Sequence, residues 1–142
     1  MKKFLWAALL ALTCLGAKAQ DFRIEVAPDI PQAASALLVQ RFTQMLETGG
    51  LSVWTPSEEE AEAPDGLRIL TIGYEITSRM DTPGSLTQVA LNIELTASAG
   101  ETSQTFPVKG VGDDYADAWL RAVKQVLPRS RDAQAFVGRL KF

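Results

Sequence analysis

Residues 86–127 constrain the fold most, because the spacing of apolar residues changes part-way along this stretch. Between residues 86 and 97, apolar and polar residues alternate with a single slip, which is typical of a strand with one buried face. From Tyr115 to Val126 the apolar residues recur at helical spacing. A change in period from two residues to about 3.6 predicts a helix that packs on one face of a sheet.

Similar patterns predict the other elements. Predicted strands span residues 22–26, 51–54, 67–78, 86–98 and 103–110. The last three are joined by short links and should form an antiparallel meander. One helix should begin after a capping Asp29 and end at Gly49-Gly50, and another should span residues 114–127. We therefore predict a single α+β domain over residues 20–142, a two-layer sandwich in which two helices cover one face of an antiparallel sheet. Residues 132–142 fit either a helical turn or a closing strand.

Residues 1–19 have the pattern of a signal peptide. Two lysines precede an apolar run from Phe4 to Leu15, and Ala17-Lys18-Ala19 matches a cleavage site. The run is shorter than the roughly 20 residues that span a bilayer. We expect an exported chain, periplasmic or associated with the outer membrane, that begins at Gln20 or Asp21 and has no transmembrane span. Lipidation at Cys14 is the alternative, although Thr13 is not the small residue that usually precedes a lipidated cysteine.

Residues 20–142 are acidic. Eleven basic residues face 17 acidic ones, which leaves a net charge of −6 once the three lysines of residues 1–19 are set aside. A negative domain repels phosphate backbones, so we do not expect nucleic acid binding.

Residues 20–142 contain neither histidine nor cysteine. This excludes Ser–His–Asp and Cys–His catalysis, disulfides and the usual thiolate–imidazole zinc sites, and we expect no cofactor. The acidic segment 56–66 lacks the alternating ligands of a calcium loop, which favours a solvated loop. Glu75 and Glu94, on the polar faces of neighbouring strands, are the remaining candidates for acid–base work. Exposed charges on a sheet are the simpler interpretation.

Lys109-Gly110-Val111-Gly112 is the stretch that most resembles a ligand loop. A glycine-rich turn before a helix can bind phosphate, but Asp113 and Asp114 place negative charge where the anion would lie. The favoured interpretation is a tight turn in which Gly112 takes a positive φ and Asp113 caps the helix.

The aromatic residues are interpreted mainly as core. Tyr115 and Trp119 are four residues apart, which suits a buried helix face better than a stacking platform for a ligand. Trp54, beside the acidic segment, is expected to be partly exposed. A possible partner or ligand surface therefore includes Trp54, Lys109, Gly110 and Gly112.

The chain resembles a group of uncharacterised exported proteins of Bacteroidetes. The resemblance covers the C-terminal two thirds of residues 20–142. It rests on Leu70-Thr71, residues 88–95, the run Lys109-Gly110-Val111-Gly112, and Ala116 and Ala118. It implies no catalytic residues, because no activity is established for the group. The order of elements is also similar, more weakly, to periplasmic domains of curli-secretion lipoproteins and of lipoprotein activators of cell-wall synthases. That similarity implies envelope assembly or partner binding.

These observations favour a non-enzymatic interaction module with an envelope protein as its partner. A sheet of this size leaves edges to which a partner strand can add, and we expect the open edge at residues 22–26 or 105–109. The alternatives are a carrier of a small apolar ligand, held between helices and sheet, and a carboxylate-based enzyme. The oligomeric state stays open.

Overall fold

The computed structural model of the chain describes residues 20–55, 66–83 and 88–141. The predicted signal peptide and most of the acidic segment lie outside these residues. The elements follow the order β1 (Gln20–Val26), α2 (Gln32–Thr48), β2 (Ser52–Val53), β3 (Arg68–Thr82), β4 (Gln88–Ala99), β5 (Thr102–Gly112), α3 (Tyr115–Val123) and α4 (Arg131–Leu140). All five predicted strands are present, and β3 and β5 are longer than expected.

The five strands form one mixed sheet in the order β2-β1-β3-β4-β5. β3, β4 and β5 are antiparallel neighbours, so the predicted meander is confirmed. The prediction of a wholly antiparallel sheet is wrong, because β1 runs parallel to both β2 and β3. β1 and β2 are parallel because α2 carries the chain back along the sheet, so that β2 starts from the same end as β1.

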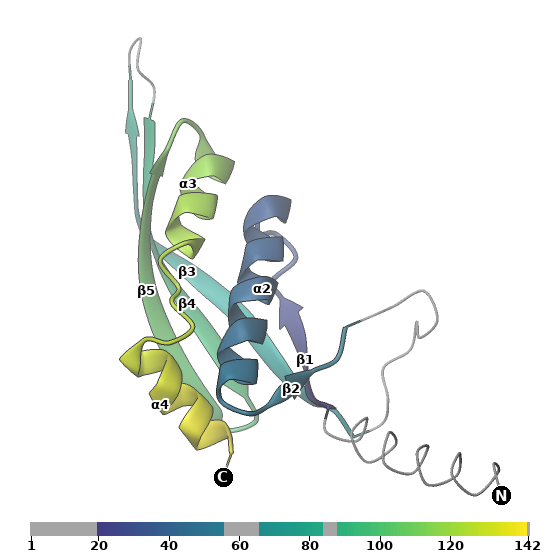
Figure 1. The fold of residues 1–142 in the computed structure, drawn as a ribbon. Helices are drawn as coiled ribbons and strands as arrows, with labels where there is room; N and C mark the ends of the chain where they lie inside the picture. The colour runs from purple at the N-terminus through teal and green to yellow at the C-terminus, as the bar shows by residue number, and fades with distance from the viewer. Residues whose placement is uncertain (1–19, 56–65, 84–87, 142) are drawn as a thin grey trace, which may run out of the picture.

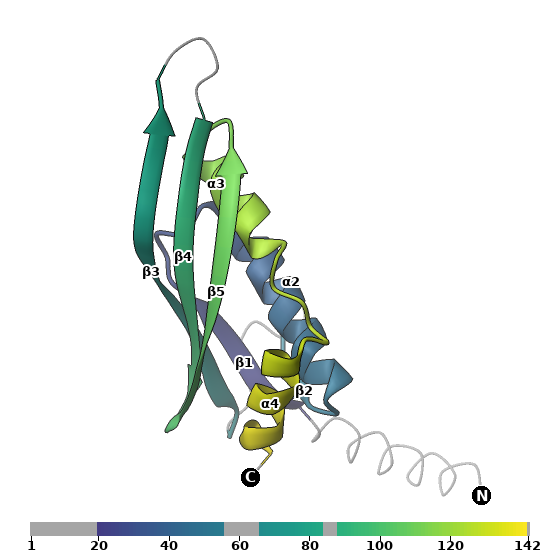
Figure 2. The ribbon, with the colours of Figure 1, turned by 90° about the vertical axis from the view of Figure 1, so that its left-hand side faces the viewer.

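Helices α2, α3 and α4 pack on the same face of the sheet (Figures 1 and 2). Two helices were expected, and α4 is the third. Ser130 caps it by accepting a hydrogen bond from the N–H of Ala133 at 3.2 Å. The open choice for the C-terminal residues is thus decided in favour of a helix. The sheet curls around the helices as a half-barrel, and its opposite face carries none of the described helices (Figure 2).

The core fills the space between the helices and the inner face of the sheet. Phe106 of β5 makes edge-to-face contacts with Phe42 of α2, at 5.5 Å between ring centroids, and with Phe136 of α4, at 6.0 Å. Phe22 and Trp119 are fully buried in the same cluster. The third helix therefore belongs to the same core as the other two.

The loop between β1 and α2 differs from the prediction. Pro31 is the N-cap of α2 and makes no side-chain capping bond, so the predicted capping role of Asp29 is wrong. Asp29 instead accepts a 2.6 Å hydrogen bond from the hydroxyl of Tyr74 on β3. This bond raises the pKa of Tyr74 to about 12, with burial adding to the effect.

Candidate functional site

The run from Lys109 to Gly112 is the end of strand β5 and not a turn. Its side chains therefore alternate between the two faces of the sheet. Gly110 and Gly112 are buried on the helix side, whereas Lys109 and Val111 are exposed on the opposite side. The strand brings no loop of free N–H groups to the start of α3, so the phosphate-loop interpretation has no geometric support.

The two glycines are needed because α3 lies against β5. A Cβ on Gly112 would lie 2.5 Å from the nitrogen of Ala118, and one on Gly110 would lie 2.6 Å from the nitrogen of Ala122 and overlap the carbonyl oxygen of Ala118. The expected positive φ at Gly112 is wrong, because the described glycines with positive φ are Gly50, Gly66 and Gly100. Close packing, and not a special backbone conformation, explains the glycines.

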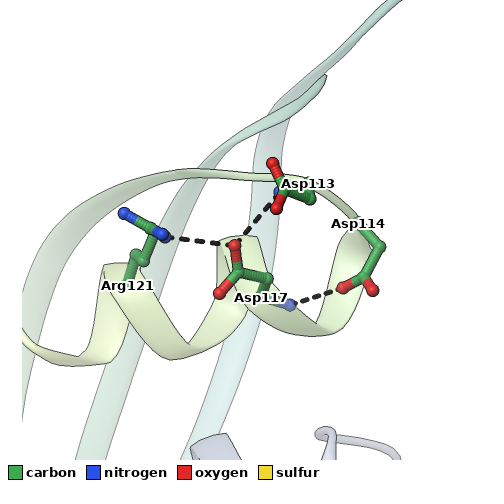
Figure 3. A network of polar contacts seen from close by, with 4 residues as sticks. All are labelled: Asp113, Asp114, Asp117 and Arg121. Atoms are coloured by element: carbon green, nitrogen blue, oxygen red, sulfur yellow. Dashed lines mark hydrogen bonds and ion pairs between the residues drawn. The ribbon is translucent and has the colours of Figure 1, made fainter. Parts of the chain in front are cut away.

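Acidic residues just before α3 and in its first turn accept hydrogen bonds from one another's main-chain N–H groups (Figure 3). Asp114, and not the expected Asp113, is the N-cap, and its carboxylate accepts from the N–H of Asp117 at 2.7 Å. The carboxylate of Asp117 accepts from the N–H of Asp113 and from Arg121 Nε, both at 3.1 Å. The bond from Asp113 is the main cause of the lowered pKa of Asp117, and Arg121 lowers it further. These contacts give the cluster a capping role.

The tryptophans belong to the core. Trp119 has no exposed surface and packs edge-to-face on Tyr74, with ring centroids 4.8 Å apart, so its predicted core role is confirmed. The expectation that Trp54 is partly exposed is wrong: it is 5% exposed and follows β2, where its main-chain N–H donates to the carbonyl of Phe22 at 2.8 Å. Trp54, Gly110 and Gly112 are therefore not on the surface, which leaves Lys109 as the accessible member of the predicted set.

The sheet face turned away from the helices, here called the open face, is the main exposed feature. On it, Glu75 and Glu94 lie directly opposite each other on β3 and β4, as predicted, and both are exposed. Further along, Met80, Ala90 and Val111 are in register across β3, β4 and β5. We call these three residues the apolar row; Met80 is 68% and Val111 is 51% exposed. The alternation in the sequence predicted a polar, exposed sheet face, but only the strand register shows that these three residues are neighbours on it.

Three grooves lie around the helices and the sheet edge. The first, of about 640 Å³, lies between the end of α2 and the segment after α3, where Leu127 is 57% exposed. The second, of about 270 Å³, lies between α2 and α4. The third, of about 330 Å³, lies at β5 and includes Glu94 and Lys109. None of the three is between the helices and the sheet, where an apolar ligand of a carrier was expected.

The sheet edges differ from the prediction as well. The expected open edge at residues 22–26 is present only in part: β1 lies between β2 and β3, but among the described residues β2 pairs with it only at Gln20 and Phe22. β5 is an edge strand, as expected, but side chains cover part of it. The N–H of Lys109 donates to Gln125 Oε1 at 2.8 Å, and Arg139 donates to the carbonyl of Ser103 at 3.1 Å.

Within residues 20–55, 66–83 and 88–141, no helix is long and apolar enough to cross a membrane. Among the same residues, no three side chains of the His, Cys, Asp and Glu types converge as metal ligands would.

Comparison with known proteins shows no family for the chain. No protein-family model matches it, and no curated protein matches its sequence. Among solved structures, it is similar to a minor lipoprotein from Acinetobacter baumannii, at 11% identity and a TM-score of 0.40, over 86% of this chain and 89% of that chain. The resemblance to exported proteins of Bacteroidetes gains no support from these comparisons.

Proposed function

We propose that the protein is an exported, non-enzymatic module of the cell envelope that binds another protein through the open face of its sheet. One observation carries the proposal. Helices α2, α3 and α4 cover one face of the sheet, whereas the described residues leave the opposite face bare, and on it the exposed side chains of Met80 and Val111 belong to one row across the sheet. A face that is polar in general but carries grouped apolar side chains is typical of a reversible protein interface.

The sequence supports the same proposal from two sides. The pattern of residues 1–19 favours export, which would place the domain in the envelope. Residues 20–142 also lack histidine and cysteine, the commonest general base and the strongest nucleophile. The first argument supports a place in the envelope, and the second favours binding over catalysis.

Site-specific photo-crosslinking in intact cells tests the proposal. A photoreactive amino acid at Thr96, which is exposed on the open face of β4, should capture one envelope protein repeatedly. The matched control is the same amino acid at Gln40, which is exposed on α2 on the other side of the sheet. Two results would contradict an interface on the open face: equal capture at both positions, or no cross-link to another protein when the photoreactive amino acid is at Thr96.

A carboxylate-based enzyme is the second candidate, because the carboxylates of Glu75 and Glu94 are on directly opposite residues. An enzyme of this kind requires turnover by the purified protein that Glu75→Gln and Glu94→Gln each remove while the fold is unchanged. Thr71→Ala, also exposed on the open face, is the control and should leave such turnover intact.

A further inference from the structure

The outer half of β3 has an edge that the sequence did not indicate. β1 pairs with β3 only as far as Val26 opposite Ile72, whereas β4 pairs with β3 as far as Thr82. Among the described residues, no strand lies beside β3 beyond Ile72, and Figure 2 shows this part of β3 rising past β1 along the rim of the sheet. Unpaired main-chain groups along such an edge are a template for another strand.

The pairing pattern shows which main-chain groups point outward. The carbonyl of Ile72 accepts from the N–H of Ala27 at 3.0 Å, so Ile72 directs its main chain away from β4. Alternate residues of an antiparallel strand do the same. A register shift between Ile76 and Ser78 moves this alternation by one residue. Beyond the shift, Arg79 and Asp81 direct their N–H and C=O groups outward, and Met80 directs its own toward β4.

The regular part of this edge is short. The register shift is at one end, and Pro83, which has no N–H, follows at the other end. Between them lie residues 78–82, here called the β3 edge segment. Its length is sufficient for a few main-chain hydrogen bonds and limits how strongly another strand can bind.

The β3 edge segment is complementary to itself. Arg79 and Asp81 are on the helix side of the strand and are opposite in charge, and Ser78 and Thr82 are both hydroxyl residues on the open face. We infer that the protein forms a symmetric dimer in which two β3 edge segments pair antiparallel around Met80. Arg79 of each copy then lies opposite Asp81 of the other, and Ser78 lies opposite Thr82.

This register also satisfies the main chain. Arg79 and Asp81 of the two copies exchange N–H···O=C bonds, while the two Met80 residues form a pair without such bonds, as antiparallel geometry requires. Arg79 already makes a 3.0 Å ion pair with Asp81 of its own chain. The dimer would place two such pairs side by side, with alternating charges across the interface.

The open face supplies the apolar contact. Met80 is the β3 member of the apolar row and is 68% exposed. With Met80 against Met80, the apolar rows of the two copies join into one stripe across a continuous sheet. An unrelated strand could add to the same edge, but the symmetry of charges and hydroxyls about Met80 favours a second copy.

Sedimentation velocity over a series of concentrations tests the dimer with purified protein alone, independently of the open-face proposal. We expect a monomer–dimer equilibrium. Monomer at every concentration would overturn the inference, and so would association with the same affinity in the Arg79→Asp variant.

A disulfide tests the contact at Met80. In the proposed dimer, Met80→Cys would place two thiols within the roughly 4.4–6.8 Å Cα separation that a disulfide needs. Residues 20–142 contain no other cysteine that could react. Mild oxidation should link this variant into dimers, and Thr96→Cys, in the middle of the sheet, should remain unlinked.

Mixing two charge variants tests the register. Arg79→Asp places only acidic side chains at the interface and Asp81→Arg only basic ones, so each alone should dimerise about tenfold more weakly. An equimolar mixture should associate again, since each acidic edge then meets a basic one. Mixing cannot restore the ion pair within a chain, so recovery identifies a contact between chains. Failure of the mixture to recover overturns the proposed register.

The ion pair of Arg23 and Glu25 provides a matched control. It has the same spacing along a strand and an N–O distance of 2.9 Å, but it belongs to β1 and lies away from the β3 edge segment. Arg23→Asp and Glu25→Arg should leave dimerisation unchanged. If they weaken it as strongly as the changes in β3, net charge and not the β3 edge controls association, and the inference is wrong.

Discussion

The two faces of the sheet differ in what restricts their residues. On the helix side, Gly110 and Gly112 are in contact with the backbone of α3, and added atoms have no space. On the open face, Lys109 and Val111 of the same strand are exposed. Neighbouring residues in one strand are thus subject to opposite requirements. The helix side is therefore more sensitive to substitution than the open face.

The largest expected effect is on the helix side, at Trp119. Trp119→Ala should lower the free energy of unfolding by about 3–5 kcal/mol, because it leaves a large cavity under α3. Val111→Ala, on the open face, should change it by less than about 0.5 kcal/mol. Urea denaturation measures both. A loss below about 1 kcal/mol for Trp119→Ala would show that the helix side tolerates loss of volume.

A smaller effect is expected within β5 itself. Gly112→Val should cost about 1–3 kcal/mol, because its side chain would enter the space of α3. Lys109→Ala should be nearly neutral, because only its main-chain N–H is used, by Gln125. Equal stability of the two variants would mean that α3 can shift away from β5. Loss of a biological function in Lys109→Ala at unchanged stability would instead support a role for Lys109 in ligand binding.

Removing one charge of the carboxylate pair on the open face should stabilise the protein modestly, whereas the two preceding substitutions destabilise it. Glu75 and Glu94 are directly opposite, and like charges in this position destabilise a sheet. Glu75→Gln should raise the free energy of unfolding by about 0.2–1 kcal/mol at neutral pH and low salt. The gain should shrink at high salt, because screening already weakens the repulsion in the unchanged protein. A loss of stability would show that Glu75 makes a favourable contact.

The last prediction concerns pH and the helix side. The folded pKa of Tyr74, about 12, is above its ordinary value of 10.0 because of the bond to Asp29. The stabilisation is therefore complete below pH 10 and is lost as the pH rises through 12. The chain has two tyrosines, so ultraviolet titration of Tyr115→Phe reports Tyr74 alone. A midpoint near 10 would contradict the hydrogen bond, and adding Asp29→Asn should lower the midpoint.

Sequence alone determined most of the elements and the face of each that is buried, although it left residues 132–142 open between a helical turn and a strand. The alternation predicted for residues 86–97 is present in the described part, residues 88–97, and the helical spacing around Trp119 also appears in the structure as predicted. These patterns are local, because a side chain's direction follows from its position in its own strand or helix. The interpretation of Trp119 as core, and of Glu75 and Glu94 as exposed neighbours, needed no knowledge of the rest of the fold.

Tertiary structure decided which segments lie side by side. Main-chain hydrogen bonds hardly depend on residue type, so alternation does not show that β1 is parallel to its neighbours or that β3 has a free edge. The glycines of β5 suited a turn equally well until α3 was seen against them. Asp29 was expected as a cap for a similar reason, because its actual partner, Tyr74, is distant in sequence. Each of these features depends on a contact between distant segments, and such contacts form only when the whole core is assembled.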